Sequence, residues 1–213
     1  MYYYIAMIPF FTGEYDKKEV TTMCGRYTLA SAEDLSDFED IINEIQRSET
    51  ARKDILQGDI YPTDLAPVLI PENRMAIPKL VVWGFPGFKG KGVIINARAE
   101  TAPSKPLFSG ALSYGRCVIP STGFFEWDKR TKQKYQFNLP DSRALYMAGL
   151  VREFEGQRRF VILTTSANES MQDIHDRMPV ILDKNDIEAW LYDSSYTGYF
   201  LQRTPPVLEK RAV

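Results

Sequence analysis

Four short segments of the chain concentrate side chains that can act as nucleophiles, proton carriers or hydrogen-bond partners. Cys24 supplies a thiol, Asn96 an amide, Glu126 a carboxyl group and His175 an imidazole. Each lies beside apolar residues or a turn, a setting that holds a polar side chain rigidly in place. We name them the cysteine segment (23–27, MCGRY), the asparagine segment (96–100, NARAE), the glutamate segment (116–127, RCVIPSTGFFEW) and the histidine segment (174–182, IHDRMPVIL).

Each of these residues alone also has an ordinary structural explanation. Cys24 fits a buried cysteine in a first strand, and Asn96 fits the cap of a turn. Glu126 fits an exposed strand position in an aromatic hairpin, and a single histidine is often structural. Cys117, between Val118 and Ile119, is expected to be a buried strand residue without a chemical role.

Together and in this order, the four segments resemble the SOS response-associated peptidase (SRAP) family, whose members crosslink to abasic DNA through an N-terminal cysteine. The resemblance covers about residues 23–183. It implies that Cys24 is the nucleophile, that Asn96 orients it, and that Glu126 and His175 move protons. Phe125 departs from the family, in which tyrosine is usual before Glu-Trp.

The same resemblance implies which side chains contact DNA. Arg26 and Arg98 match the family's phosphate-binding arginines, and Arg116 and Arg177 are further candidates. Of these four, two are expected to reach phosphate and the others to form structural ion pairs. Trp83, within VVWGF, resembles an aromatic position that stacks near the break in the strand path.

The chemistry explains why a terminal cysteine is suited to this role. An abasic site exists partly as a ring-opened sugar aldehyde, which a primary amine attacks to give a Schiff base. An α-amino group titrates near ~7.7–8.0, against ~10.4 for lysine, so a substantial fraction of it is neutral near pH 7 without a buried site. The thiol then closes a five-membered thiazolidine ring on the imine, with the effective concentration of an intramolecular reaction.

This reaction requires a free amine on Cys24, which removal of Met23 would supply. We therefore expect residues 1–22 to be an extension that is either not translated or removed, in front of a single domain at 23–213. The codons of residues 18–20 (KEV) can be written AAG GAG GTN, a bacterial ribosome-binding sequence at a suitable distance from Met23. With the extension attached, the thiol alone forms only a reversible hemithioacetal.

Composition excludes several other classes of protein. A net charge of −2 excludes a uniformly basic nucleic-acid surface, so phosphate binding must depend on local clusters of Arg and Lys. Two cysteines are too few for a disulfide scaffold, and no spacing suggests a metal site. The expected protein is cytoplasmic and monomeric, without cofactor, metal or membrane segment, and its partner is single-stranded DNA containing abasic sites.

The elements that must position these residues are mostly short strands. Apolar stripes predict helices at 31–47 and 186–192. Apolar runs between Pro and Gly residues predict strands near 65–70, 79–85, 92–96, 115–120, 134–139, 144–150 and 159–164. This pattern indicates an α+β fold with a curved or barrel-like, mostly antiparallel sheet and a few flanking helices.

Two other functions remain open from the residues. A cysteine peptidase would use Cys24 as nucleophile, His175 as base and Glu126 to orient it, and self-cleavage would explain residues 1–22. A non-covalent reader of damaged or single-stranded DNA would bind in a salt-sensitive manner without forming a bond. The family resemblance favours the covalent crosslink, with hydrolase or lyase activity as a related possibility.

Overall fold

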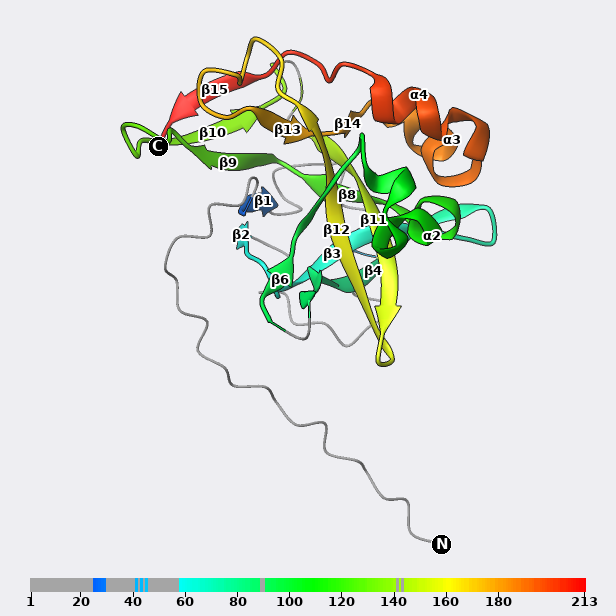
Figure 1. Cartoon of the computed structure of the whole chain (residues 1–213). Coiled ribbons are helices and arrows are strands. Elements are labelled where there is room, and N and C mark those ends of the chain that lie inside the picture. Colours follow the sequence, from blue (N-terminus) through cyan, green and yellow to red (C-terminus); the bar gives the residue numbers. More distant parts are fainter. Residues whose placement is uncertain are drawn as a thin grey trace, which may run out of the picture.

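The computed structural model describes residues 25–29, 41, 43, 45, 58–88, 91–140, 142 and 144–213. Its centre is a closed ring of five strands (Figure 1). The strand β11 pairs with both β8 and β12, and the ring continues from β12 through β4 and β3 back to β8. All pairs are antiparallel except β4 with β12. These strands are β3 (Leu65–Glu72), β4 (Met75–Trp83), β8 (Arg116–Ser121), β11 (Leu145–Phe154) and β12 (Gln157–Ser166).

Tight turns fix the register of two hairpins in this barrel. Asn73 and Arg74 join β3 to β4 with φ of 51° and 62°, and Glu155 and Gly156 join β11 to β12 with φ of 51° and 78°. Two successive residues with positive φ make the turn whose twist matches that of paired strands. Asparagine and glycine tolerate this conformation most readily, so each turn contains one residue suited to it.

A second, five-stranded sheet lies beside the barrel in the order β15-β10-β9-β1-β2. Its strands are β1 (Tyr27–Leu29), β2 (Gly58–Ile60), β9 (Gly123–Trp127), β10 (Lys134–Asn138) and β15 (Glu209–Ala212). The chain passes from β8 directly into β9 at Gly123, where φ is 152°. A Cβ at this position would lie 2.7 Å from the Phe137 carbonyl oxygen, so only glycine allows the close approach.

Short strands attach to the ends of the barrel. They are β5 (Phe85–Pro86), β6 (Val93–Ile94), β7 (Asn96–Arg98), β13 (Arg177–Pro179) and β14 (Ile181–Leu182). Both β7 and β13 pair with the end of β12, whereas β5 and β6 form a separate hairpin. Because the asparagine and histidine segments contain β7 and β13, this arrangement brings the two segments together.

Short helices cover the other side of the barrel, opposite β9, β10 and β15 (Figure 1). They are α2 (Pro106–Tyr114), α3 (Ile187–Tyr192) and α4 (Thr197–Gln202), with single 3-10 turns at η4 (Ala102–Ser104), η5 (Lys184–Asp186) and η6 (Ser194–Tyr196). Pro106 occupies the first turn of α2, where a missing N–H carries no penalty. None of the helices described is long and apolar enough to cross a membrane.

Apolar side chains form two cores, one on each face of the barrel strands. On β8, Cys117 and Ile119 belong to the core that also holds Trp83, whereas Val118 belongs to the core under the helices with Trp190. Strands buried on both faces have continuous apolar sequences rather than alternating ones. This explains the uninterrupted apolar character of the barrel segments.

The predicted α+β fold with a barrel-like sheet is confirmed. The seven predicted strands correspond to β3, β4, β6 with β7, β8, β10, β11 and β12, and the helix predicted at 186–192 is α3. Of the helix predicted at 31–47, only residues 41, 43 and 45 are described, and these are helical. The helices α2 and α4 were not predicted from the sequence, and neither were the strands β1, β2, β9, β13, β14 and β15.

Candidate functional site

Strand pairing between β1 and β9 joins the cysteine and glutamate segments. Tyr27 lies opposite Phe124, and the Phe125 N–H donates to the Arg26 carbonyl oxygen at 2.9 Å. Cys24 itself lies outside the described residues. The described part of its segment nevertheless runs along the strand that carries Glu126.

The end of β12 joins the asparagine and histidine segments. On one edge of β12, Asn96 lies opposite Ile162 and Arg98 lies opposite Thr164. On the other edge, Arg177 lies opposite Ser166. Two segments far apart in the sequence therefore flank the same few residues of one strand.

Two contacts connect these pairs of segments to each other. Lys129, just after the glutamate segment, forms an ion pair with Asp176 of the histidine segment at 3.2 Å. Trp83 packs its ring 5.1 Å from that of Tyr27 and donates its indole N–H to the Ile95 carbonyl oxygen at 3.1 Å. The sequence predicted that all four segments serve one site, and these contacts link their described parts.

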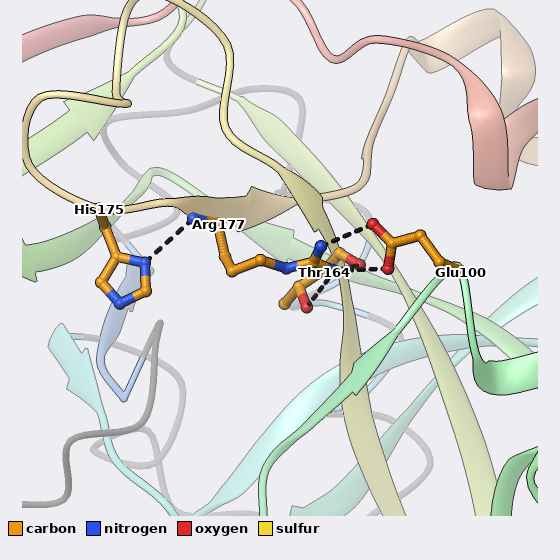
Figure 2. Close-up of polar contacts among 4 residues, drawn as sticks. All are labelled: Glu100, Thr164, His175 and Arg177. Atoms are coloured by element: carbon orange, nitrogen blue, oxygen red, sulfur yellow. Dashed lines mark hydrogen bonds and ion pairs between the residues drawn. The ribbon is translucent and has the colours of Figure 1, made fainter.

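His175 is held in a defined orientation next to this junction. Its Nδ1 accepts a hydrogen bond from the Arg177 backbone N–H at 3.1 Å (Figure 2) and lies 3.0 Å from the Asp176 carboxylate. Burial, reinforced by Lys129, lowers the pKa of His175, while Asp176 opposes that shift. The neutral imidazole therefore keeps its proton on Nε2, whereas a protonated imidazole can donate from Nδ1 to Asp176.

Arg177 is fixed by a bidentate ion pair with Glu100. Its guanidinium donates to the two carboxylate oxygens at 2.6 and 2.8 Å, and also to the Thr164 carbonyl oxygen at 2.6 Å (Figure 2). The hydrogen bond from Arg177 lowers the pKa of Glu100, and the nearby Arg98 adds to this effect. Arg177 can therefore meet a phosphate only by exchanging Glu100 for it.

Glu126 and Asn96 differ in their exposure to solvent. Glu126 is only 5% exposed, on β9 opposite Tyr135, and its chain neighbours Phe124 and Phe125 are buried as well. Asn96 is half-buried at the start of β7. A carboxyl group in such an apolar setting suits proton transfer, and a side-chain amide can orient a nucleophile without titrating.

Two of the residues predicted to contact DNA lie in the interior instead. Trp83 is fully buried, with its ring stacked on that of Phe160, so it cannot place its ring against a base. Arg116 is 5% exposed and donates to the carbonyl oxygens of Leu112, Trp190 and Leu191. Both predictions are corrected: Trp83 supports the backbone before Asn96, and Arg116 ties α2 and α3 to β8.

The remaining predicted DNA contacts are on the surface. Arg98 is exposed on β7. The side chain of Arg26 is 25% exposed and lies between the rings of Tyr61 and Trp127, at 4.5 and 5.2 Å from their centroids, and 3.4 Å from an Asp59 carboxylate oxygen.

A further candidate that was not predicted from the sequence is Phe88, which is 82% exposed after β5. It lies in the loop between β5 and β6, closed by hydrogen bonds from Gly87 to Gly92 and from Lys91 to Phe88. The signal in the sequence was an aromatic residue within a stretch of Gly and Lys (PGFKGKG), where no core can cover it. An exposed ring with lysines nearby is a suitable partner for a base.

The fold and the site define a barrel domain that gathers a carboxyl group, an imidazole and a cysteine-containing segment on and beside strands outside the barrel. Residues 23–208 match the sequence profile of the SOS response associated peptidase (SRAP) family. The chain therefore belongs to this family, as the sequence motifs predicted.

Relatives with assigned names agree with this membership. The chain is 34% identical over 195 residues to the abasic site processing protein YoaM of Bacillus subtilis, covering 84% of each chain. It is also 34% identical over 121 residues to the abasic site processing protein YedK of Escherichia coli, covering 52% of this chain and 53% of that protein.

Solved structures share the fold. A protein from Bordetella bronchiseptica has a TM-score of 0.71 at 24% identity, covering 89% of this chain and 99% of that one. A protein from Bacteroides thetaiotaomicron has a TM-score of 0.70 at 22% identity, covering 89% and 92%. At these identities the likeness supports the fold alone.

Proposed function

We propose that this chain processes abasic sites in single-stranded DNA by bonding to them covalently through Cys24. The observation that carries the proposal is the meeting of the described parts of the four segments around β9 and the end of β12. Family membership and the names of relatives, which are called abasic site processing proteins, support the choice of substrate.

The bond forms in two balanced steps. The Cys24 amine attacks the sugar aldehyde and the adduct loses one water, leaving a C=N bond. The Cys24 sulfur then adds to the imine carbon while the nitrogen gains a proton, which closes a thiazolidine ring without loss of further atoms. The product therefore weighs as much as protein plus DNA minus one water.

Three side chains are assigned to proton transfer and orientation. His175 donates a hydrogen bond from Nε2 to the sugar oxygen as the ring opens, and its protonated form, stabilised by Asp176, delivers the proton. Glu126 exchanges protons with the amine and the departing hydroxyl during dehydration. Asn96 holds the amine or thiol of Cys24 by hydrogen bonds.

The DNA strand is held by surface residues on both sides of this site. Arg26 and Arg98 bind phosphates, and Phe88 takes the stacking role first assigned to Trp83. Arg177 joins them where a phosphate displaces Glu100.

The reaction also requires that Cys24 be the first residue of the chain. Because the amine must be free, the reactive form begins at Cys24, and residues 1–22 together with Met23 must be absent from it. The start of the family match at residue 23 supports this assignment.

The test uses protein expressed from Met23 and a single-stranded oligonucleotide with one abasic site. Intact mass should show the cysteine-terminal protein plus DNA minus one water, and Cys24→Ala should show none. Cys24→Ser forms the imine but a weaker ring, so its adduct should appear only after borohydride reduction. If the protein is a peptidase, the chain expressed from Met1 should lose residues 1–22, and Cys24→Ala should retain them. If it is a non-covalent reader of DNA, it should bind without forming any denaturant-resistant product.

A further inference from the structure

The outer face of the five-stranded sheet carries an alternating row of aromatic rings and cations. The row consists of Tyr61, Arg26, Trp127, Lys134 and Phe125. Arg26 lies over the rings of Tyr61 and Trp127 at 4.5 and 5.2 Å, and Lys134 lies over the rings of Phe125 and Trp127 at 3.8 and 6.0 Å. From Tyr61 after β2 and Arg26 before β1 to the residues of β9 and β10, each cation thus separates two aromatic planes.

Four members of this aromatic–cation row are accessible to a ligand, whereas Phe125, only 6% exposed, lies beneath Lys134. Tyr61 is 39% exposed and the Arg26 side chain 25%, while Trp127 and Lys134 are half-buried. Within the described part of the chain, Lys134 has no carboxylate within ion-pair distance, and Arg26 has only Asp59 at 3.4 Å. A cation held over ring faces rather than against a carboxylate keeps its charge available for an anion.

The row continues to the edge of the sheet. Gln136 lies opposite Phe125 on one side and opposite Arg211 on the other, so the three share a face of the sheet. Arg211 is exposed on β15, the last strand. Neighbouring strands lie about 4.8 Å apart, so the surface from β2 to β15 extends roughly 19 Å.

We propose that this face is a binding track for undamaged single-stranded DNA flanking the lesion. The inference rests on the proposed function only in that Arg26 is already assigned to a phosphate next to the site. Bases stack on Tyr61 and contact Trp127, and phosphates meet Arg26, Lys134 and Arg211. Alternating planes and cations match alternating bases and phosphates, whereas an acidic peptide offers carboxylates without planes to stack. The −2 net charge is compatible because only this face needs to be basic.

The track is tested without the covalent reaction. Protein begun at Met23 and carrying Cys24→Ala is titrated with undamaged oligo-dT, at several salt concentrations, by fluorescence anisotropy. For single strands, each lost phosphate contact reduces the slope of log K against log salt by about 0.7. Lys134→Gln and Arg211→Gln should each reduce it by that amount, and Arg158→Gln, at the exposed start of β12, should not.

Tryptophan emission gives a second readout of stacking. Trp83 and Trp190 are fully buried, so quenching of emission by oligo-dT should report Trp127 and disappear in Trp127→Phe. Equal thermal midpoints of the variants exclude unfolding as the cause of a lower slope or of lost quenching. If Lys134→Gln is unstable, Arg211→Gln still tests the track, because Arg211 is exposed.

The track would be overturned if the salt slopes of Lys134→Gln and Arg211→Gln equalled that of Arg158→Gln. It would also be overturned if oligo-dT still quenched the tryptophan emission of Trp127→Phe. An acidic peptide that competes as well as oligo-dT at equal charge would also contradict it. Crosslinking to an abasic oligonucleotide by the Cys24-containing protein is scored separately. A failed track with intact crosslinking rejects only this inference, and a failed crosslink with intact binding rejects only the proposed chemistry.

Discussion

Replacing Trp83 by phenylalanine separates a supporting role from a role in stacking on DNA. The indole N–H donates to the Ile95 carbonyl oxygen at 3.1 Å, immediately before Asn96, and the ring packs against Tyr27, which follows Arg26. Loss of one buried neutral hydrogen bond costs about 1 kcal/mol. Loss of the apolar area of the smaller ring of the indole costs roughly another 1.5 kcal/mol.

The sum predicts that Trp83→Phe lowers the free energy of unfolding by about 2–3 kcal/mol, or the thermal midpoint by roughly 5–10 °C. The Ile95 carbonyl still accepts from the Ile162 N–H at 3.0 Å, so the strand should shift rather than detach. A small displacement of Asn96 should slow crosslinking by about tenfold. Affinity for undamaged single-stranded DNA should not change, because Trp83 is fully buried.

Trp190→Phe is a matched control. Trp190 is equally buried and donates its indole N–H to a backbone oxygen, that of Cys117, at 2.9 Å, under the helices. It should lose similar stability and keep the crosslinking rate. If Trp83→Phe crosslinks as fast as Trp190→Phe but loses DNA affinity, Trp83 acts at the surface and our correction of its role is wrong.

Four further predictions follow from the polar contacts. Because burial lowers the pKa of His175, its neutral form should dominate at pH 7 with the proton on Nε2. ¹⁵N NMR of this single histidine reports both its protonation state and its tautomer, and a dominant Nδ1–H form would refute the assignment. The same shift lowers the free energy of unfolding as the pH drops below about 6.5 toward the lower pKa of His175 in the folded protein. Measured by urea unfolding, this decrease should be smaller in His175→Gln than in the unsubstituted protein. Glu100→Gln removes the ion pair of Arg177, so it should strengthen binding of undamaged single-stranded DNA in anisotropy titrations. An unchanged affinity would mean that Arg177 does not exchange Glu100 for a phosphate. Arg116→Met leaves buried carbonyl oxygens unpaired, so it should lower the free energy of unfolding in urea by about 3 kcal/mol or more. The DNA affinity of the folded protein should not change, and a selective loss of affinity would restore Arg116 as a DNA contact.

The barrel was predictable because its strands are buried on both faces, which gives apolar runs bounded by turn residues. The strands that build the site were harder to predict. Residues 177–179 and 181–182 lie in an apolar run but form strands too short to show a strand period, and β15 is fully exposed, so it has no apolar pattern at all. These strands form because they pair with β11, β12 and β10, a long-range effect that local sequence does not encode.

The site residues were predictable from the motifs, but their surroundings were not. Trp83 and Phe88 are both aromatic residues near glycines, and only the closure of the barrel shows that one is enclosed and the other is exposed. Arg116 and Arg98 likewise differ in the structure far more than in the sequence. Burial of an arginine depends on carbonyl oxygens from distant helices, in this case at Leu112, Trp190 and Leu191.

The most direct test of the central claim is the mass of the product formed by a chain whose terminal amine is blocked. Protein that begins at Cys24 and the same protein acetylated at its terminus are each incubated with an abasic oligonucleotide and analysed by denaturing mass spectrometry. We predict a stable product of protein plus DNA minus one water for the free amine and none for the acetylated form. A stable product of acetylated protein plus DNA minus one water would contradict the thiazolidine and show that another nucleophile makes the bond.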